Sequence, residues 1–467
     1  MTQALRIGIA GLGTVGGGAL RILLNQQALL AARTGRTLQV VAVSARDKKK
    51  YERLLAGMNQ ANAPLLTSPR KQGEELEEGR GGKMPSPNPL PEGEGIRWLD
   101  DPMALASDPE IDVVVECIGG SEGVAKLLVE TALKHKKSVV TANKALIAHH
   151  GVALAELAEA NDALLAFEAA VAGGIPIIKG LRDGLAANRF TRIAGILNGT
   201  CNYILTTMAS EKRDFGDVLA EAQAKGYAEA DPSFDIDGVD AAHKLAILGS
   251  LAYGIRPAID QVSIEGIRRV TLADMQFADE LGYVIKLLGI ASEEEGGILM
   301  RVHPCLVAKG SQLAAVGGAF NAVLVEGDSV GTVLFEGRGA GEGPTASSVV
   351  ADIMDIARGA SYKPFTLPAA KLGEGRFAEF SRASSSFYLR LGVIDQPGVL
   401  ADVTAIFKKE GISMRSVIQH SHNPGEMVQV VITTHATQEA AMERALTAIA
   451  KLPFMKEAPF RVRIEGF

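Results

Sequence analysis

The stretch Leu5-Arg6-Ile7-Gly8-Ile9-Ala10-Gly11-Leu12-Gly13-Thr14-Val15-Gly16 decides the fold of this 467-residue chain. A strand-like run leads into a G-x-G-x-x-G loop, then a helix-like stretch to about residue 30 and a second apolar run over 38–43. This is a βαβ unit with a dinucleotide fingerprint at its first turn, although a tight glycine-rich turn without a ligand is the alternative. The helix N-terminus would offer N–H donors to phosphates. We therefore predict cofactor binding at Gly11, Gly13, Thr14, Val15 and Gly16.

Further strand candidates at 111–115 and 138–140, separated by helical patterns, predict a parallel, doubly wound sheet. Residues 1–143 are thus expected to form a Rossmann-type nucleotide domain. Residues 64–95 interrupt it with six Pro and six Gly and no apolar periodicity, so we interpret them as a disordered insertion. The segment Ser44–Lys50 has no acid directly at the strand end, and Arg46 with the following lysines could hold a 2′-phosphate. This favours NADP, with NAD as the alternative.

Composition is that of a globular protein of about three domains, with 47% apolar and 22% charged residues. The net charge of −6 argues against nucleic-acid binding, and no run of 18 apolar residues suggests a membrane span. The N-terminal residues lack the pattern of a secretory signal. The three cysteines, at 117, 201 and 305, are widely spaced and odd in number. We therefore expect a cytoplasmic protein without a disulfide framework or a zinc site.

The C-terminal part, residues 385–467, has a rhythm of its own. Strands are predicted at 387–393, 412–419, 427–434 and 460–464, and helices at 398–409 and 438–452. This βαββαβ order predicts a small ferredoxin-like α+β domain. Residues 144–367 mix helices and strands and are expected to form an α+β substrate and dimerisation domain, with 345–359 as a helix that returns to the nucleotide domain.

The densest set of chemical groups lies between Gly226 and Lys244, where five acids occur within twelve residues. Asp240 and Lys244 are four residues apart, so on a helix they share one face. The carboxylates could hold an ammonium group while the lysine exchanges a proton, but an acidic loop with an ordinary ion pair is equally consistent. Lys144 follows a strand at the edge where ligands bind, although a surface lysine is the usual case. The small-residue turn 168–176 suits a hard monovalent cation, with a plain tight turn as the stronger alternative.

Five segments, in this order, resemble homoserine dehydrogenases: VVTANKALIA (139–148), EAAVAGGIPII (168–178), GILNGTCNYIL (195–205), residues 226–244 and GRGAGEGPTASSVVADI (337–353). The resemblance implies reversible, NAD(P)H-dependent reduction of aspartate 4-semialdehyde to L-homoserine, in threonine, methionine and isoleucine biosynthesis. It implies proton transfer by Lys244, with Lys144 near nicotinamide and substrate. The implied substrate residues are Glu229, Asp240, Asp235, Gly226 and Tyr227. A sodium ion would be held by Glu168 and the backbone oxygens of Val171, Gly173 and Ile175, and Gly341 would be a second cofactor contact. Cys201 departs from the family, which usually has threonine there.

The segment DQPGVLA (395–401) is similar to the ligand loop of ACT domains, which sense amino acids. The resemblance implies an effector site at Asp395 and Gly398, feedback by threonine, and a homodimer or homotetramer; a purely structural dimerisation module is the alternative. A hydroxyacid dehydrogenase with an ACT domain would need a catalytic histidine with a carboxylate partner, and none is embedded that way. An inactive amino-acid sensor is disfavoured by the intact Lys244, Glu229 and Asp240. Because the lysine must be neutral to accept a proton, homoserine oxidation should favour alkaline pH.

Overall fold

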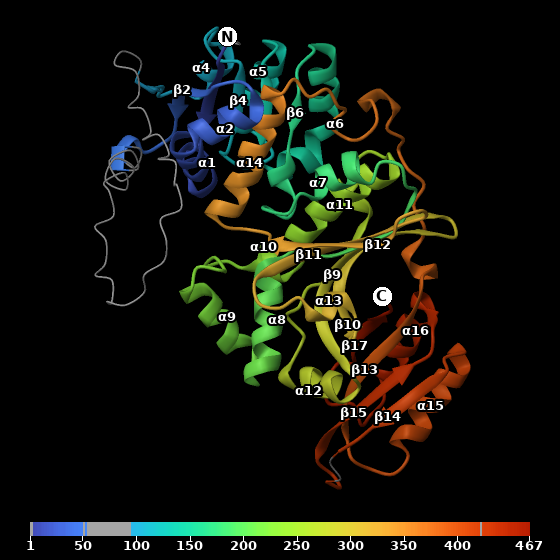
Figure 1. Ribbon diagram of the computed structural model, residues 1–467. Coiled ribbons are helices and arrows are strands. Elements are labelled where there is room, and N and C mark those ends of the chain that lie inside the picture. Colours follow the sequence, from blue (N-terminus) through green and yellow to red (C-terminus); the bar gives the residue numbers. More distant parts are fainter. Residues whose placement is uncertain (1–2, 50–51, 54–94, 421–422) are drawn as a thin grey trace, which may run out of the picture. The chain divides into compact units, whose positions relative to one another are not determined.

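The computed structural model describes residues 3–49, 52–53, 95–420 and 423–467 (Figure 1). The predicted insertion, residues 64–95, lies outside the described residues apart from its last position. The chain forms two compact units. The first comprises Met1–Leu146, Ala153–Ala169 and Gly341–Pro364, and the second comprises Ile147–Val152, Ala170–Ala340 and Phe365–Phe467. Among the described residues, no helix is long and apolar enough to cross a membrane.

The first unit is built on a six-stranded sheet with the order β3-β2-β1-β4-β5-β6, in which every pair is parallel. This order confirms the predicted Rossmann-type fold, because it reverses direction between β1 and β4. The strands are β1 (Leu5–Ala10), β2 (Leu38–Ser44), β3 (Arg97–Trp98), β4 (Val113–Glu116), β5 (Ser138–Thr141) and β6 (Leu165–Ala166). The helices are α1 (Thr14–Asn25), α2 (Gln27–Thr34), α4 (Met103–Ser107), α5 (Val124–Lys134), α6 (Lys144–Ala160) and α14 (Glu342–Ala357).

Both faces of β1 are covered, which explains its unbroken apolar run. Ile7 and Ile9 belong to one buried cluster with residues of α1 and α14, while a Cβ at Gly8 would lie 2.9 Å from Leu105 of α4. Helix α14 packs closely on α1, because a Cβ at Gly18 would lie 2.7 Å from the side chain of Glu342. Figure 1 shows α14, in orange, beside the blue α1. A segment far along the chain thus completes the core of the first unit.

The second unit contains an 11-stranded sheet whose main path runs β12-β11-β7-β9-β10-β17-β13-β15-β14. The strands are β7 (Phe190–Ile196), β8 (Val262–Ile264), β9 (Tyr283–Glu294), β10 (Gly297–Ala308), β11 (Phe320–Gly327), β12 (Gly331–Arg338), β13 (Ser384–Ile394), β14 (Met414–Ile418), β15 (Met427–Thr434), β16 (Thr437–Gln438) and β17 (Phe460–Glu465). The helices are α7 (Ile177–Lys179), α8 (Gly199–Glu211), α9 (Phe215–Ala224), α10 (Ser233–Ile236), α11 (Val239–Tyr253), α12 (Leu272–Glu280), α13 (Gln312–Ala315), α15 (Val399–Glu410) and α16 (Glu439–Ile449).

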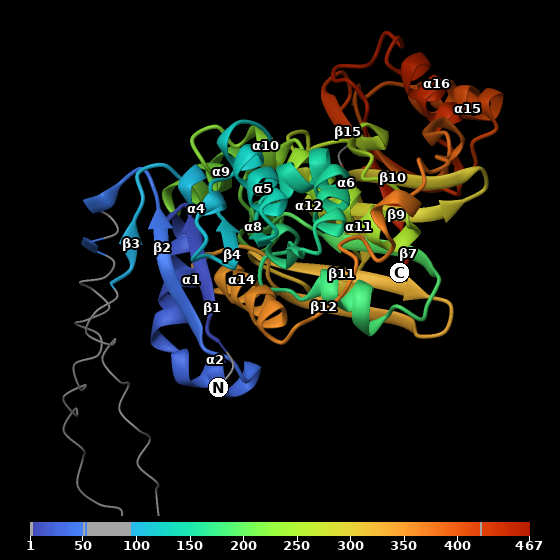
Figure 2. The ribbon, with the colours of Figure 1, turned by 90° about the horizontal axis from the view of Figure 1, so that it is seen from above.

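The C-terminal strands and helices follow the predicted βαββαβ order, with the spatial order β17-β13-β15-β14 of a ferredoxin-like sheet. Strand β15 coincides with its predicted range, and the other elements differ from theirs by one to three residues at an end. Figure 2 shows α15 and α16 packed together on one side of these strands. The sequence did not predict that β17 also pairs in parallel with β10, in the register Cys305↔Arg463 to Val307↔Glu465. This pairing joins the C-terminal strands to the other strands of the second unit in one sheet.

Candidate active site

The glycine loop between β1 and α1 has the geometry that a dinucleotide-binding fingerprint requires. Gly11 has φ +90°, and a Cβ there would lie 2.5 Å from the carbonyl oxygen of Cys117. A Cβ at Gly16 would lie 1.9 Å from the carbonyl oxygen of Gly11, so only glycine lets the helix approach this closely. Gly13 precedes α1 without any side-chain cap and would meet nothing within 4 Å, and Thr14 and Val15 open the helix. Close backbone approach by a phosphate is therefore sterically open at Gly13.

A cavity of about 580 Å³ adjoins this loop at the carboxyl ends of β1, β2 and β4. It is lined by Gly11, Leu12, Gly13, Ser44, Ala45, Arg46, Asp47, Asp100, Pro102, Cys117, Ile118 and Val124. Arg46 lies where a ribose 2′-substituent is expected, but Asp47 lines the same cavity. The predicted preference for NADP rests on the lack of an acid directly at the end of β2. Asp47, which lies three residues after that end, was not singled out. Burial, and secondarily Glu116, raise the pKa of the Cys117 thiol, which disfavours the thiolate form.

A hydrogen-bond network joins the carboxyl ends of β4 and β5 beside Lys144. The carboxylate of Glu116, fully buried, accepts hydrogen bonds from Thr141 Oγ1 at 2.5 Å and from the backbone N–H groups of Ile118 and Gly119. Asn143 caps helix α6 and donates to the carbonyl oxygen of Gly120. Lys144, the first residue of α6, is thus held on a fixed strand end. Sequence reasoning missed Glu116, although its place at the end of a buried strand was a usable signal.

The predicted pair Asp240 and Lys244 lies on one face of α11 in the second unit. Lys244 Nζ donates to Asp240 Oδ2 at 2.7 Å and to the carbonyl oxygen of Leu197 at 2.7 Å. Both side chains are buried, with residue exposures of 9% for Lys244 and 4% for Asp240. These two bonds use two of the three N–H donors of the ammonium group, which leaves one for a ligand. A buried lysine held in this way is unlike an ordinary surface ion pair, because its position is fixed.

Asn198, which the sequence analysis did not single out, organises the acids around Lys244. Its Nδ2 donates to Asp240 Oδ2 at 2.9 Å and to Asp235 Oδ1 at 2.8 Å. Its Oδ1 caps helix α8 by accepting from the N–H of Cys201. The thiol of Cys201, fully buried, donates to the carbonyl oxygen of Asp235, and burial together with Asp235 raises its pKa. Cys201 therefore packs as a buried hydrogen-bond donor.

The remaining predicted substrate residues lie on the loop between α9 and α10. Gly226 has φ +73°, as a residue after a helix often does, and Tyr227 is 48% exposed. The backbone of Tyr227 accepts a hydrogen bond from Thr200 Oγ1, which ties this loop to the start of α8. The side chain of Glu229 is exposed. The structure thus brings Asp235, Asp240 and Lys244 together through Asn198 and places Gly226, Tyr227 and Glu229 on an accessible loop beside α8.

The predicted cation ligands fall on a turn that starts in the first unit and continues in the second. Glu168 is 2% exposed, and its backbone N–H donates to Asp352 of α14. Val171 and Ile175 are buried. Ala172 and Gly173 have φ +55° and +49°, and a Cβ at Gly173 would lie 2.3 Å from the carbonyl oxygen of Gly339. Gly341, with φ +108°, precedes α14.

The predicted effector residues lie at the start of α15. Gly398 has φ +99° and precedes the helix with no side-chain cap. Asp395 accepts a hydrogen bond from the N–H of Asn423 and exchanges backbone hydrogen bonds with Gly425 and Glu426. The loop 395–398 is therefore fixed to the turn before β15. Among the residues that the structure describes, none lies within 4 Å of a Cβ placed at Gly398.

Three family models match the chain. The model described as homoserine dehydrogenase matches residues 176–354, that of the homoserine dehydrogenase NAD binding domain matches 87–168, and that of the ACT domain matches 387–454. The homoserine dehydrogenase of Pseudomonas aeruginosa is 41% identical over 99% of both chains, and that of Bacillus subtilis is 36% identical over 99% of both chains. The structure of a homoserine dehydrogenase from Thiobacillus denitrificans covers 100% of both chains, with 40% identity and a TM-score of 0.86. That of a hyperthermophilic archaeal homoserine dehydrogenase in complex with NADPH covers 76% of this chain and 97% of that one, with 27% identity and a TM-score of 0.59.

Proposed function

The chain belongs to the homoserine dehydrogenase family, and from that premise we propose how its own residues carry out the reaction. The enzyme interconverts aspartate 4-semialdehyde and L-homoserine with a nicotinamide cofactor, which supplies the hydride when bound. We assign proton transfer to Lys244 and binding of the substrate's polar ends to Asp240, Asp235 and Glu229. The observation that carries this assignment is the buried ammonium of Lys244, fixed by Asp240 and the carbonyl oxygen of Leu197 with one donor left over.

In the reductive direction, negative charge develops on the aldehyde oxygen of the substrate. The ammonium group of Lys244 would donate its remaining N–H to this oxygen, stabilise the developing negative charge and then transfer a proton to it. Asp240 keeps the ammonium group in place, and Asn198 keeps Asp240 in place. In the oxidative direction the neutral lysine takes the hydroxyl proton of homoserine. Gly226 and Tyr227 shape the loop that carries Glu229, which suits the substrate ammonium group.

For the cofactor, we propose that Gly11, Gly13, Thr14, Val15 and Gly16 bind the pyrophosphate and that NADP is preferred over NAD. Arg46 in the cavity supports this preference, since a guanidinium binds a 2′-phosphate strongly. Asp47 beside it is the reason why NAD remains the competing choice. Lys144 would face the nicotinamide, and Gly341 would make the second cofactor contact. If NAD supported equal or faster turnover in the wild type, the preference would be wrong.

We also propose a sodium ion at Glu168 and the carbonyl oxygens of Val171, Gly173 and Ile175. The carboxylate of Glu168 is buried, and the turn that follows has positive φ angles at Ala172 and Gly173. Carboxylate and carbonyl oxygens are the hard donors that such an ion prefers. The ion would stabilise this turn. Measuring turnover in sodium-free buffer with added potassium, and then with added sodium, tests the requirement.

Threonine is the proposed effector, bound at Asp395 and Gly398 of the ACT domain in a homodimer or homotetramer. The uncapped N-terminus of α15 suits the carboxylate of an amino acid. Threonine should inhibit the enzyme and raise its melting temperature; if it does neither, this assignment fails. Light scattering during size-exclusion chromatography tests the oligomeric state. We further propose a cytoplasmic location, which the three free thiols at 117, 201 and 305 support.

The decisive experiment on Lys244 compares two substitutions at that position in a spectrophotometric assay with homoserine and NADP. Lys244→Met should lower kcat roughly 10²–10⁴-fold, because a positioned acid–base group contributes about that much. Lys244→Arg keeps the charge but transfers protons poorly and should lose most of the activity too. Lys126→Met is the matched control, since Lys126 also forms i,i+4 ion pairs but lies on α5. Near-normal turnover of Lys244→Met would refute the assignment.

A further inference from the structure

We propose that His303, Cys305 and Glu465 form a binding site for a thiophilic divalent transition-metal ion such as Zn²⁺. The three residues are buried, with exposures of 1%, 0% and 8%. Each offers one ligand atom, and these atoms all lie within 4.8 Å of one another. The set contains none of the residues assigned above to substrate, cofactor, sodium or effector. It lies where the last strand of the ACT domain meets the strand β10.

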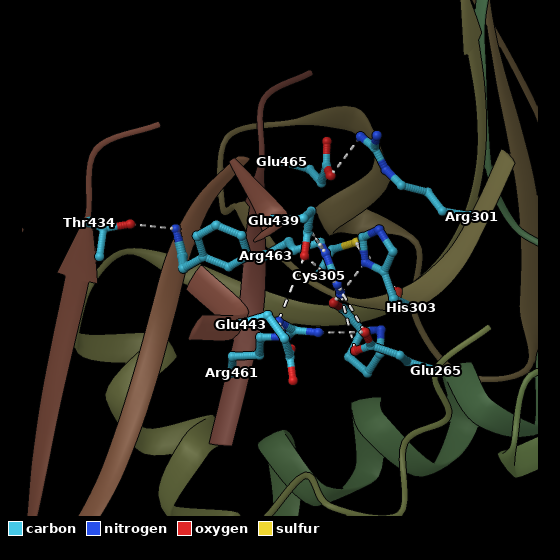
Figure 3. A network of polar contacts seen from close by, with 12 residues as sticks. Glu265, Arg301, His303, Cys305, Thr434, Glu439, Glu443, Arg461, Arg463 and Glu465 are labelled. Carbon is cyan, nitrogen blue, oxygen red and sulfur yellow. Dashed lines mark hydrogen bonds and ion pairs between the residues drawn. The ribbon is translucent and has the colours of Figure 1, made fainter. Parts of the chain in front are cut away.

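The arrangement of the three side chains suits a tetrahedral metal site. His303 and Cys305 are two residues apart on β10, so they point to the same face of the sheet, and Glu465 reaches them from β17 (Figure 3). His303 Nδ1 lies 3.2 Å from Cys305 Sγ. Bond lengths of about 2.0–2.3 Å to zinc place tetrahedral ligand atoms roughly 3.5 Å apart. The Nδ1–Sγ contact places the imidazole ring against the thiol. The three ligand atoms all lie within 4.8 Å of one another, so they need to approach by no more than about 1.3 Å to reach that spacing.

His303 carries an unsatisfied polar atom, which is the second observation that points to a ligand. Its Nε2 is buried and has no hydrogen-bond partner among the residues that the structure describes. Such an atom costs free energy unless something fills the position, and metal-binding histidines bind through one ring nitrogen while the other keeps a hydrogen bond. Nδ1 of His303 has such a partner in the carbonyl oxygen of Pro304, at 3.1 Å.

The charges around the site are balanced. Arg463 is fully buried and pairs with Glu439 and Glu265, and Arg301 pairs with Glu465 at 3.0 Å (Figure 3). Since carboxylates already neutralise these guanidinium groups, a dication would meet no net positive field. Burial, followed by Arg463 and Arg301, lowers the pKa of His303, which keeps the imidazole in the neutral form that binds metals. Arg461 and Glu443 complete this network, in which three guanidinium groups face four carboxylates. On binding, Cys305 releases its proton to solvent, and its thiolate together with the one excess carboxylate balances the dication.

A metal at this position would fasten β17 to β10 and thereby the ACT domain to the strands on which helix α11, with Asp240 and Lys244, packs. This proposal differs from the sequence-based expectation of no zinc site, because Cys305 and Glu465 are 160 residues apart and fit no spaced ligand motif. Only the pairing of the two strands brings them together. The ion would be structural rather than catalytic, so its removal should lower the melting temperature of the protein.

The test uses the full-length protein, purified without oxygen, stripped with a chelator and titrated with Co²⁺, followed by competition with Zn²⁺. Wild type should develop a thiolate-to-cobalt absorption band that saturates at one equivalent, and Zn²⁺ should abolish it. Cys305→Ser should lose the band, whereas Cys201→Ser, which removes the other fully buried thiol, should retain it. His303→Asn and Glu465→Gln should weaken binding by more than the roughly 10–100-fold that loss of an outer hydrogen-bond partner costs.

A second measurement on the wild type keeps the test valid if a variant fails to fold. Zn²⁺ should protect Cys305 from alkylation during partial unfolding and leave the rate at Cys201 unchanged. Absence of the cobalt band, its survival in a folded Cys305→Ser protein, or equal protection of both thiols would overturn the proposal. In that case, His303 and Cys305 form only a neutral imidazole–thiol contact.

Discussion

Asn198 offers the sharpest test of how the substrate site is held together, because its side chain has two separable tasks. Its amide nitrogen bridges Asp235 and Asp240, and its amide oxygen caps helix α8. Asn198→Ser keeps an N-cap oxygen but cannot bridge the two acids. Asn198→Ala loses both tasks. Asn198→Asp keeps the cap and places a third carboxylate against the other two.

The expected magnitudes follow from these contacts. Each of the two bridging bonds joins an amide to a carboxylate, at 2.8 and 2.9 Å, and such bonds contribute about 1.5–3 kcal/mol. If water recovers half of the sum, about 1.5–3 kcal/mol of positioning is lost, which is roughly a ten- to 150-fold fall in kcat/KM. Asn198→Ser should show this fall. Asn198→Ala should in addition be less stable than Asn198→Ser by about 1 kcal/mol, the usual value of a cap.

The assay measures kcat and KM for homoserine with NADP, together with urea unfolding of each variant. Activity should decrease in the order wild type, Asn198→Ser, Asn198→Asp, because an added negative charge displaces Asp240 from Lys244. Stability should instead separate Asn198→Ala from the two capped variants. Wild-type kcat/KM in a folded Asn198→Ser protein would refute the bridging role. A fall in activity that merely tracks stability would show that Asn198 acts only as a cap.

Three other predictions concern the cofactor loop, a buried arginine and a buried lysine. Gly16→Ala should destabilise the first unit and abolish cofactor binding, since the added Cβ would lie 1.9 Å from a backbone oxygen. Gly13→Ala should fold normally and only raise the KM for NADP, because no described atom lies within 4 Å of its Cβ. Equal unfolding curves for the two variants would contradict this prediction. Arg463→Met leaves Glu439 and Glu265 with only their longer contacts to Arg461, at 3.8 and 3.4 Å. It should lower the unfolding free energy by up to about 3–5 kcal/mol, measured in urea, and a loss below about 1 kcal/mol would show that the network is dispensable. Burial lowers the pKa of Lys286 to about 8, below its ordinary value of 10.5. Between pH 8 and pH 10.5 the unfolded chain therefore binds more protons at this lysine than the folded protein does. The free energy of unfolding should rise with pH in that interval, by up to about 3 kcal/mol. Subtracting the curve of Lys286→Met should isolate this rise, and identical pH profiles would disprove it.

The sequence predicted the parts of the molecule that depend on short-range pattern. The glycine fingerprint between two apolar runs predicted the nucleotide sheet, because strand, turn and helix chemistry all act within about forty residues there. The i,i+4 spacing of Asp240 and Lys244 predicted their pairing, since a helix alone brings them together. The ferredoxin-like order followed from alternating strand and helix periods. Each of these predictions needed only local geometry.

What the sequence could not predict depends on which strand ends meet. Asn198 bonds to Asp235 and Asp240 because the end of β7 lies beside α10 and α11. In the sequence, an asparagine at this position indicates no more than a helix cap. The carboxylate of Glu116 accepts a hydrogen bond from Thr141, which lies on the neighbouring strand. Arg463 reads as a surface residue in a strand, yet it is fully buried between Glu265 and Glu439. Charged residues become buried only with partners, and the partners here come from distant segments.

The pairing of β17 with β10 also changes what kind of attachment the ACT domain has. Strand β17 has a parallel neighbour in β10 and an antiparallel neighbour in β13, so it joins the ACT strands to the rest of the sheet. Removing residues 385–467 would leave one edge of β10 unpaired from Cys305 to Val307, where the residues are buried, while its other edge stays paired with β9. An exposed apolar edge of this kind promotes aggregation. Loss of activity after such a truncation would therefore report on the integrity of the substrate sheet, and only point substitutions at the effector loop can report on regulation.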